Sequence, residues 1–423
     1  MTDPSSTTQT APVDTEGPVP LVEPRDGVPS PLTRPEQLAE VIEAFRAGHG
    51  PVAVDAERAS GYRYGQRAYL VQLRRDDVGT VLIDPVDLTD LSALGAALEG
   101  DEWVLHAASQ DLPCLAELGL RPQRVFDTEL AGRLLGYPKV GLGSMVEEVL
   151  GLSLEKGHSA ADWSTRPLPE PWLRYAALDV EVLVELRHRL ADQLDEQGKR
   201  AWAEQEFAAI AASPAPAPRQ DPWRRTSGMH RVRTRRQLAV VRSLWETRDD
   251  IARRRDISPG RVLPDAAIVE AALAMPATED DLLKLSVFNG RSLRRHVRTW
   301  FAAVEAARGL PDRALPELKA AHDGPPPARS WAERDPHAAA RLAAARPAVA
   351  AIADEHGLPT ENLLAPDTVR RLAWSPPADL DVPTVAGFLR AHGARTWQVD
   401  LTATALAKAL ERAVLHEDEP PLA

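Results

Sequence analysis

The sequence predicts a mixed α/β domain followed by two helical units in a chain of 423 residues. Up to residue 212, short runs rich in valine and leucine alternate with segments of helical period, which is typical of a sheet with helices packed on it. From residue 229 onward the apolar positions keep a helical spacing. The length accommodates about three domains at roughly 150 residues each.

The elements of the α/β part can be placed from their apolar patterns. The run that contains Asp55 is rich in valine and short, as buried strands are. The next two apolar runs are separated by a short polar stretch and therefore read as a hairpin. In chain order we expect strands at residues 51–57, 68–74, 80–84 and 103–108, and helices at 88–98, from Asp111 onward, and at 172–186.

Four carboxylates and one tyrosine in these elements are the candidate site. Asp55 and Glu57 leave the same face of their strand, because strand side chains alternate with period two. Asp111 follows the end of another strand, where ligand sites of α/β sheets collect. Tyr175 and Asp179 are four residues apart and so share one helix face.

This residue set predicts a site for two divalent metal ions that cuts phosphodiesters. Carboxylates are almost never fully buried unless they are paired or ligating, yet Asp55 and Glu57 end an apolar strand. Mg²⁺ takes oxygen ligands, and two such ions can stabilise the attacking and the leaving oxygen of a displacement. Tyr175 would align the attacking water and help to remove its proton.

The motifs resemble those of ribonuclease D, in the subclass of Asp-Glu-Asp-Asp exonucleases that carries a tyrosine. Where the family usually has threonine this chain has Ala56, which faces away from the metals. The resemblance covers residues 35–310 and rests on Asp55 and Glu57, on residues 67–73, 106–112, 126–131 and 162–168, on Lys156, and on residues 175–180.

The resemblance implies a ribonuclease H-like fold and removal of single nucleotides from RNA 3′ ends, such as those of transfer RNA precursors, with Mg²⁺ or Mn²⁺ as cofactors. Lys156 and Arg166 match basic positions of the family, as contacts to phosphate or as structural ion pairs. The acidic quartet does not distinguish RNA from DNA, so a DNA 3′→5′ exonuclease is an alternative. A further alternative, an inactive RNA-binding scaffold, is disfavoured by the intact set of five residues.

Local clusters of arginine are candidate RNA contacts, since the net charge of −12 disfavours indiscriminate coating of nucleic acid. Arg224 and Arg225 lie in residues 213–228, which read as a solvated linker or as a basic strap that guides RNA. Arg253, Arg254 and Arg255 extend this stripe on the neighbouring helix.

The two helical units resemble each other. Residues 229–312 resemble the helicase-and-RNase-D C-terminal (HRDC) domain, and several of their apolar positions recur at an offset near 101. After a proline-rich linker at 313–333 we therefore expect a diverged second copy at 334–415. The second copy has acidic residues where the first has Arg253 to Arg255, so we expect it to pack on the protein rather than to bind phosphate.

The remaining features limit the setting of the protein. A single cysteine, Cys114, excludes an internal disulfide and fits the cytoplasm. No apolar run approaches the ~20 residues of a membrane helix. Residues 1–31 are expected to be a disordered tail, with the nuclease domain at 32–212. The sequence leaves the oligomeric state open.

Overall fold

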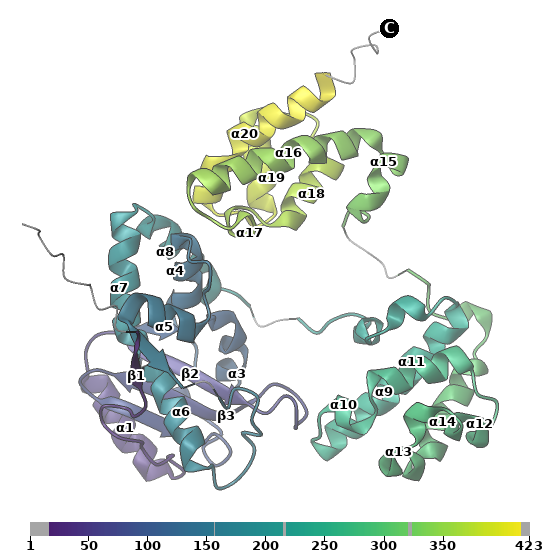
Figure 1. Ribbon diagram of the computed structural model, residues 1–423, viewed down its shortest axis with the longest axis horizontal. Helices are drawn as coiled ribbons and strands as arrows, with labels where there is room; N and C mark the ends of the chain where they lie inside the picture. Colours follow the sequence, from purple (N-terminus) through teal and green to yellow (C-terminus); the bar gives the residue numbers. More distant parts are fainter. Residues whose placement is uncertain (1–16, 156, 215–216, 320–323, 416–423) are drawn as a thin grey trace, which may run out of the picture.

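The computed structural model describes residues 17–155, 157–214, 217–319 and 324–415, arranged as an α/β unit and two helical units (Figure 1). We call these the α/β unit, up to residue 214, the first helical unit, residues 217–319, and the second helical unit, residues 324–415.

The α/β unit is built on a five-stranded sheet with the order β4-β3-β2-β5-β6. β2 pairs antiparallel with β3, and β3 with β4, whereas β2, β5 and β6 are parallel. The sheet is therefore mixed, as predicted, and β2 is its central strand. The strands are β2 (Val52–Arg58), β3 (Ala68–Arg75), β4 (Gly79–Ile83), β5 (Glu102–Leu105) and β6 (Arg124–Asp127).

Helices cover both faces of this sheet. Val52 and Val54 of β2 pack in one apolar core with α1 and α2, whereas Ala53 points into a second core with α4, α5, α7 and α8. Asp55 and Glu57 leave β2 on the same side as Ala53. The helices of this unit are α1 (Pro35–Ala47), α2 (Ser92–Ala97), α3 (Leu112–Glu117), α4 (Thr128–Leu135), α5 (Leu142–Leu150), α6 (Glu170–Glu181), α7 (Leu183–Glu196) and α8 (Arg200–Ala211).

Several expected elements differ from the structure in their bounds, and the helix expected at 88–98 spans only Ser92–Ala97. β5 stops at Leu105, because Ala107 adopts a left-handed conformation with φ 60° and a 3₁₀ turn begins at Ala108. The helix expected over 172–186 is divided into α6 and α7 at Val182. Periodicity does not reveal such breaks, because the apolar spacing continues through them.

Residues 17–31 are ordered, so the prediction of a disordered tail is wrong for this part of it. The segment contains β1 (Val19–Leu21), which pairs parallel with β7 (Leu152–Leu154). Further along, Arg25 forms ion pairs with Glu181 and Glu185. These partners lie far away in the sequence, and composition alone cannot indicate them. Residues 1–16 are outside the described part.

The two helical units repeat the same helix boundaries. α16, α17 and α18 each begin 101 residues after α9, α10 and α11, respectively. The helices of the first unit are α9 (Arg235–Arg255), α10 (Pro259–Val262), α11 (Asp265–Ala274), α12 (Glu279–Leu283), α13 (Arg291–Arg295) and α14 (Val297–Arg308). Those of the second are α15 (Trp331–Arg334), α16 (Pro336–Glu355), α17 (Thr360–Leu363), α18 (Pro366–Trp374), α19 (Val382–Ala391) and α20 (Thr396–Leu415).

The first helical unit begins earlier than expected. Residues 222–225 form a 3₁₀ turn, and Trp223 is buried in the core of this unit together with residues of α9 and α11. The C-terminal part of the predicted linker 213–228 is therefore part of a folded unit. Residues 215 and 216 are outside the described part.

The second helical unit shares an apolar core with the α/β unit. Trp202 of α8 stacks on Trp397 of α20 with ring centroids 4.9 Å apart. Lys199 donates hydrogen bonds to the carbonyl oxygens of Leu134 and His356, both at 2.8 Å. These contacts agree with the expectation that this unit packs on the rest of the protein.

The first helical unit contacts the loop that follows β2. Ser258 N–H donates to the carbonyl of Tyr62 at 2.9 Å. The hydroxyl of Tyr64 donates to Asp249 at 3.1 Å, and Arg261 lies over the Tyr62 ring. Within the described residues, no helix is long and apolar enough to cross a membrane.

Candidate active site

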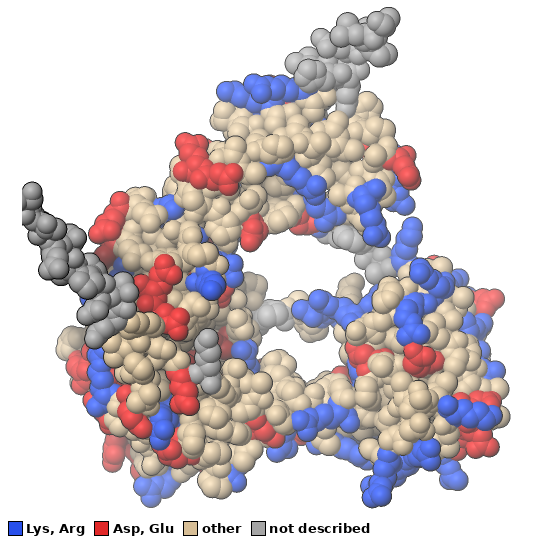
Figure 2. Space-filling model, in the orientation of Figure 1, with Lys and Arg blue, Asp and Glu red and all other residues tan. Residues whose placement is uncertain are grey.

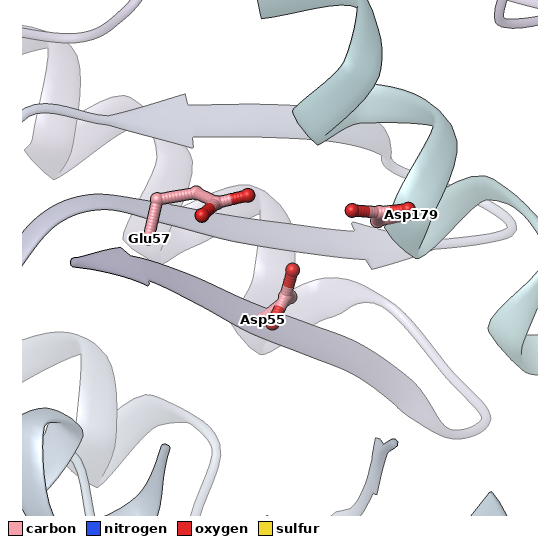
Figure 3. A group of neighbouring side chains, drawn as sticks. All are labelled: Asp55, Glu57 and Asp179. Atoms are coloured by element: carbon pink, nitrogen blue, oxygen red, sulfur yellow. The ribbon is translucent and has the colours of Figure 1, made fainter. Parts of the chain in front are cut away.

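Three carboxylates converge beside the central strand of the sheet. Asp55 and Glu57 project from β2, and Asp179 projects toward them from α6 (Figure 3). One ligand oxygen from each lies within 4.8 Å of the others. The period-two alternation of β2 and the position of α6 over the sheet therefore assemble this group as expected from the sequence.

The three carboxylates repel one another in a poorly solvated place. Glu57 is buried, with 8% of its surface exposed, and Asp55 and Asp179 are half-buried. Burial raises the pKa of each of them, and for Glu57 the charges of Asp55 and Asp179 raise the pKa further. A cation removes this electrostatic conflict, and a set of carboxylate oxygens fits a hard divalent ion. The donor set thus fits the expected metal.

Asp111 lies in the same cavity but outside this close group. It precedes α3, and its Oδ1 is 3.2 Å from Nη2 of Arg58. Burial, followed by the charge of Asp55, raises the pKa of Asp111 to about 8. The cavity measures about 730 Å³ and is lined by all four carboxylates and by Tyr175.

Tyr175 lies one helical turn before Asp179 and lines the cavity, as expected. Burial and the neighbouring charges of Asp179 and Glu57 raise the pKa of its phenol above the ordinary value. Without bound metal or RNA the phenol therefore keeps its proton, and the hydroxyl can donate a hydrogen bond. This state favours the water-aligning role over the removal of a proton.

Of the two basic residues expected near the site, Arg166 has a structural role. Its guanidinium forms an ion pair with Asp84, at 2.6 and 2.8 Å, and donates to the carbonyl of Tyr69 at 2.8 Å. Its Nη1 donates to two further carbonyls. All five N–H donors are thus used. The ion-pair alternative is therefore the one that the structure favours, and Lys156 lies outside the described residues.

The other predicted RNA contacts lie in the first helical unit and do not line the cavity that contains the carboxylates. Arg224 forms an ion pair with Asp221 at 2.9 Å and covers the Trp223 ring. The remaining four, Arg225, Arg253, Arg254 and Arg255, are exposed. Arg253 and Arg254 also form surface ion pairs with Asp250. Basic side chains gather over this unit in Figure 2.

Arg58 is a site residue that the sequence analysis missed. Strict alternation places it on the opposite face from Glu57, but the pairing of β2 with β3 shifts register between these two residues. Such bulges redirect side chains. The position of Arg58 directly after Glu57 is the one signal in the sequence that could have indicated its place in the site. The bulge depends on the pairing with β3 and cannot be predicted from the sequence of β2.

The fold and the site together define the chain as a 3′–5′ exonuclease. A family model described as 3′-5′ exonuclease matches residues 29–195, and the HRDC domain model matches residues 237–304. A third model, described as 3′ to 5′ exonuclease C-terminal domain, matches residues 324–410. The likeness of the second helical unit to an HRDC domain rests on the recurring apolar positions and on the matching helix boundaries.

Curated relatives define the family. The chain is 32% identical to ribonuclease D of Gluconacetobacter diazotrophicus, over 86% of this chain and 91% of the relative. It is 34% identical to ribonuclease D of Escherichia coli, over 68% and 76% of the two chains. The chain belongs to the ribonuclease D family and is a 3′→5′ exoribonuclease.

Solved structures extend the likeness to most of the chain. A protein from Bifidobacterium adolescentis is 38% identical with a TM-score of 0.86, covering 93% of this chain and all of its own. Ribonuclease D of Escherichia coli is 29% identical with a TM-score of 0.66, covering 90% and 98%. Both likenesses span the helical units as well as the α/β unit.

Proposed function

We propose that Asp55, Glu57, Asp179 and Asp111 hold two divalent cations, Mg²⁺ or Mn²⁺, at which RNA is hydrolysed from its 3′ end. The observation that carries this proposal is the convergence of three carboxylate oxygens within 4.8 Å in a poorly solvated place. Asp111 is separated from this group yet lines the same cavity, which suits a ligand of a second ion.

The protein side chains divide the work of the reaction. When bound, two divalent ions supply positive charge for the attacking and the leaving oxygen of an in-line displacement. The central strand β2 positions Asp55 and Glu57, and α6 positions Asp179 so that it faces these two residues. The Tyr175 phenol donates a hydrogen bond to the attacking water and aligns it with the phosphorus.

The proposed substrates are structured RNAs with a free 3′ hydroxyl, including transfer RNA precursors, and the proposed products are nucleoside 5′-monophosphates. Support comes from the relative of Escherichia coli, which is described as an exoribonuclease involved in structured RNA processing. The cytoplasmic location expected from the single cysteine stays a prediction.

Substrate preference is tested with matched RNA and DNA single strands of one sequence, incubated with each metal ion. We expect RNA to be shortened one nucleotide at a time and DNA to be shortened more slowly. Equal rates on both would support the DNA exonuclease alternative. Efficient cleavage of a circular RNA would contradict an exonuclease that needs a 3′ end.

A further inference from the structure

Arg58 lines the catalytic cavity at the point where the pairing of β2 with β3 becomes irregular. The strand pairs regularly with β3 from Ala53 to Glu57, and the register then shifts before Arg58. Bulges are common next to active sites, where they redirect a side chain. Arg58 directly follows Glu57, a carboxylate of the proposed metal site, and lines the same cavity.

The guanidinium is held against Asp111 and its neighbour. Nη2 lies 3.2 Å from Oδ1 of Asp111, and Nη1 donates to the carbonyl of Gln110. About a quarter of the side chain is exposed, at 26%, so that the group borders the open space of the cavity. Arg58 therefore bridges the end of β2 and the start of α3.

The charge balance of the cavity gives Arg58 particular weight. Two arginines are among the described residues that line it, and the other one, Arg133, is paired with Glu129 at 2.5 Å. The positive charge of Arg58 lowers the pKa of Asp55, Glu57 and Asp111, in opposition to the larger effect of burial. Arg58 thus partly neutralises the proposed metal ligands.

An arginine in this position has two successive partners available. When a carboxylate ligates a divalent ion, the ion neutralises its negative charge, and the arginine paired with it becomes available to another anion. A guanidinium can bind phosphate oxygens with two parallel hydrogen bonds. We propose that Arg58 holds Asp111 in the free enzyme and donates to a non-bridging phosphate oxygen of the RNA when Asp111 binds a cation. This inference rests on the proposed function, in which Asp111 is a metal ligand.

The test is a comparison of metal binding and turnover in Arg58→Gln. Without RNA, calorimetric titration of the full chain with Mn²⁺ should show binding that is about tenfold tighter than in the wild type, because a positive charge beside the ligands is gone. With a short end-labelled RNA, kcat/KM should instead fall about 100-fold, as when one donor to a developing charge is removed. Arg58→Lys, which keeps the charge, should bind Mn²⁺ like the wild type and recover part of the turnover.

A purely structural role predicts a different pattern. If Arg58 only positions Asp111, Arg58→Gln weakens Mn²⁺ binding and turnover together, and the inference is overturned. Unchanged turnover also overturns it. Arg200→Gln, which breaks an arginine ion pair with Asp195 on the nuclease surface, is the matched control and should change neither quantity. Asp111→Asn separates the two proposals, since wild-type turnover in that variant contradicts the assignment of Asp111 itself.

Discussion

In the protein without a bound cation, the arrangement of the active-site carboxylates lowers the stability of the folded state. Three carboxylates within 4.8 Å repel one another, and burial adds to the cost of their charges. Such an arrangement is tolerated where a bound cation compensates it. The electrostatic cost therefore points to metal binding as the purpose of the group.

Neutralising any one of the proposed ligands should abolish most of the turnover. Asp55→Asn, Glu57→Gln, Asp111→Asn and Asp179→Asn each remove one charge with little change of volume, so the fold should stay intact. We expect kcat/KM on end-labelled RNA to fall by about 100-fold or more. Asp87→Asn, an exposed aspartate on the same unit, is the control. Near wild-type turnover in one variant would remove that residue from the ligand set.

Tyr175→Phe should retain metal binding and lose rate, because it removes the water-aligning hydroxyl and no carboxylate. We expect kcat on end-labelled RNA to fall by about 10- to 100-fold. Calorimetric titration with Mn²⁺ should match that of the wild type. An unchanged kcat would exclude Tyr175 from the reaction.

The raised carboxyl pKa values predict how the free energy of unfolding depends on pH when a chelator keeps the protein free of metal. The native protein binds protons at Asp111 up to about pH 8, whereas the unfolded chain releases them near the ordinary value of 3.8. The native state therefore binds more protons, and the free energy of unfolding falls as pH rises between these limits, by at most about 1.4 kcal/mol per pH unit for one group. Melting temperatures at pH 6 and 8 measure this. Asp111→Asn should show the weaker decline, and an equal decline would contradict the role of this carboxyl.

At the level of secondary structure, the N-terminal segment braces the helix that carries Tyr175 and Asp179. β1 adds a strand to β7, and Arg25 reaches Glu181 at 3.3 Å at the end of α6. Glu181 also forms a buried ion pair with Arg74 of β3 at 3.0 Å. The back of the helix is thus tied to the sheet while its other side faces the cavity.

The two ion pairs of Glu181 should contribute very differently to stability. Glu181→Gln removes the buried partner of Arg74, which keeps an ion pair with the exposed Asp26 at 2.9 Å, and should cost about 1–3 kcal/mol. Arg25 is largely exposed, and Arg25→Gln should cost less than about 1 kcal/mol. Thermal melting of the two variants compares them. Because Glu181→Gln breaks both ion pairs, equal shifts would show that the pair with Arg74 adds little to the stability.

Prediction from the sequence succeeded where the physical signal is local. The strands at residues 51–57 and 68–84 follow from apolar runs, and the alternation along β2 brings Asp55 and Glu57 together. Signals from distant partners were missed. The Asp84 that pairs with Arg166 is 82 residues away, and the β7 strand that orders β1 is more than 100 residues away. The bulge before Arg58 depends on β3 and leaves no mark in β2 itself.

At the scale of the whole molecule, the two helical units contact the nuclease in different ways. The first is joined by polar contacts to the loop after β2, including Tyr64 with Asp249. The second extends the apolar core of the nuclease through Trp202 and Trp397. We infer that the first unit is placed to guide RNA and that the second mainly stabilises the nuclease.

This division of labour predicts separate losses of salt dependence and of stability. Replacing Arg253, Arg254 and Arg255 with Gln should weaken RNA binding and flatten the slope of log K against log salt by up to about 2, at roughly 0.7 per phosphate contact. Deleting residues 334–423 should leave the slope nearly unchanged and lower the melting temperature, since it exposes Trp202. Equal flattening by both changes would show that the second unit also holds RNA.

The most direct test of a metal-dependent 3′→5′ exoribonuclease is the digestion of an RNA labelled at its 5′ end. With Mg²⁺ or Mn²⁺ we expect a ladder that shortens by single nucleotides and releases nucleoside 5′-monophosphates. A chelator or Asp55→Asn should abolish the ladder. Internal fragments without a ladder, or an undiminished ladder in the chelator, would contradict the two-metal site at Asp55, Glu57, Asp111 and Asp179.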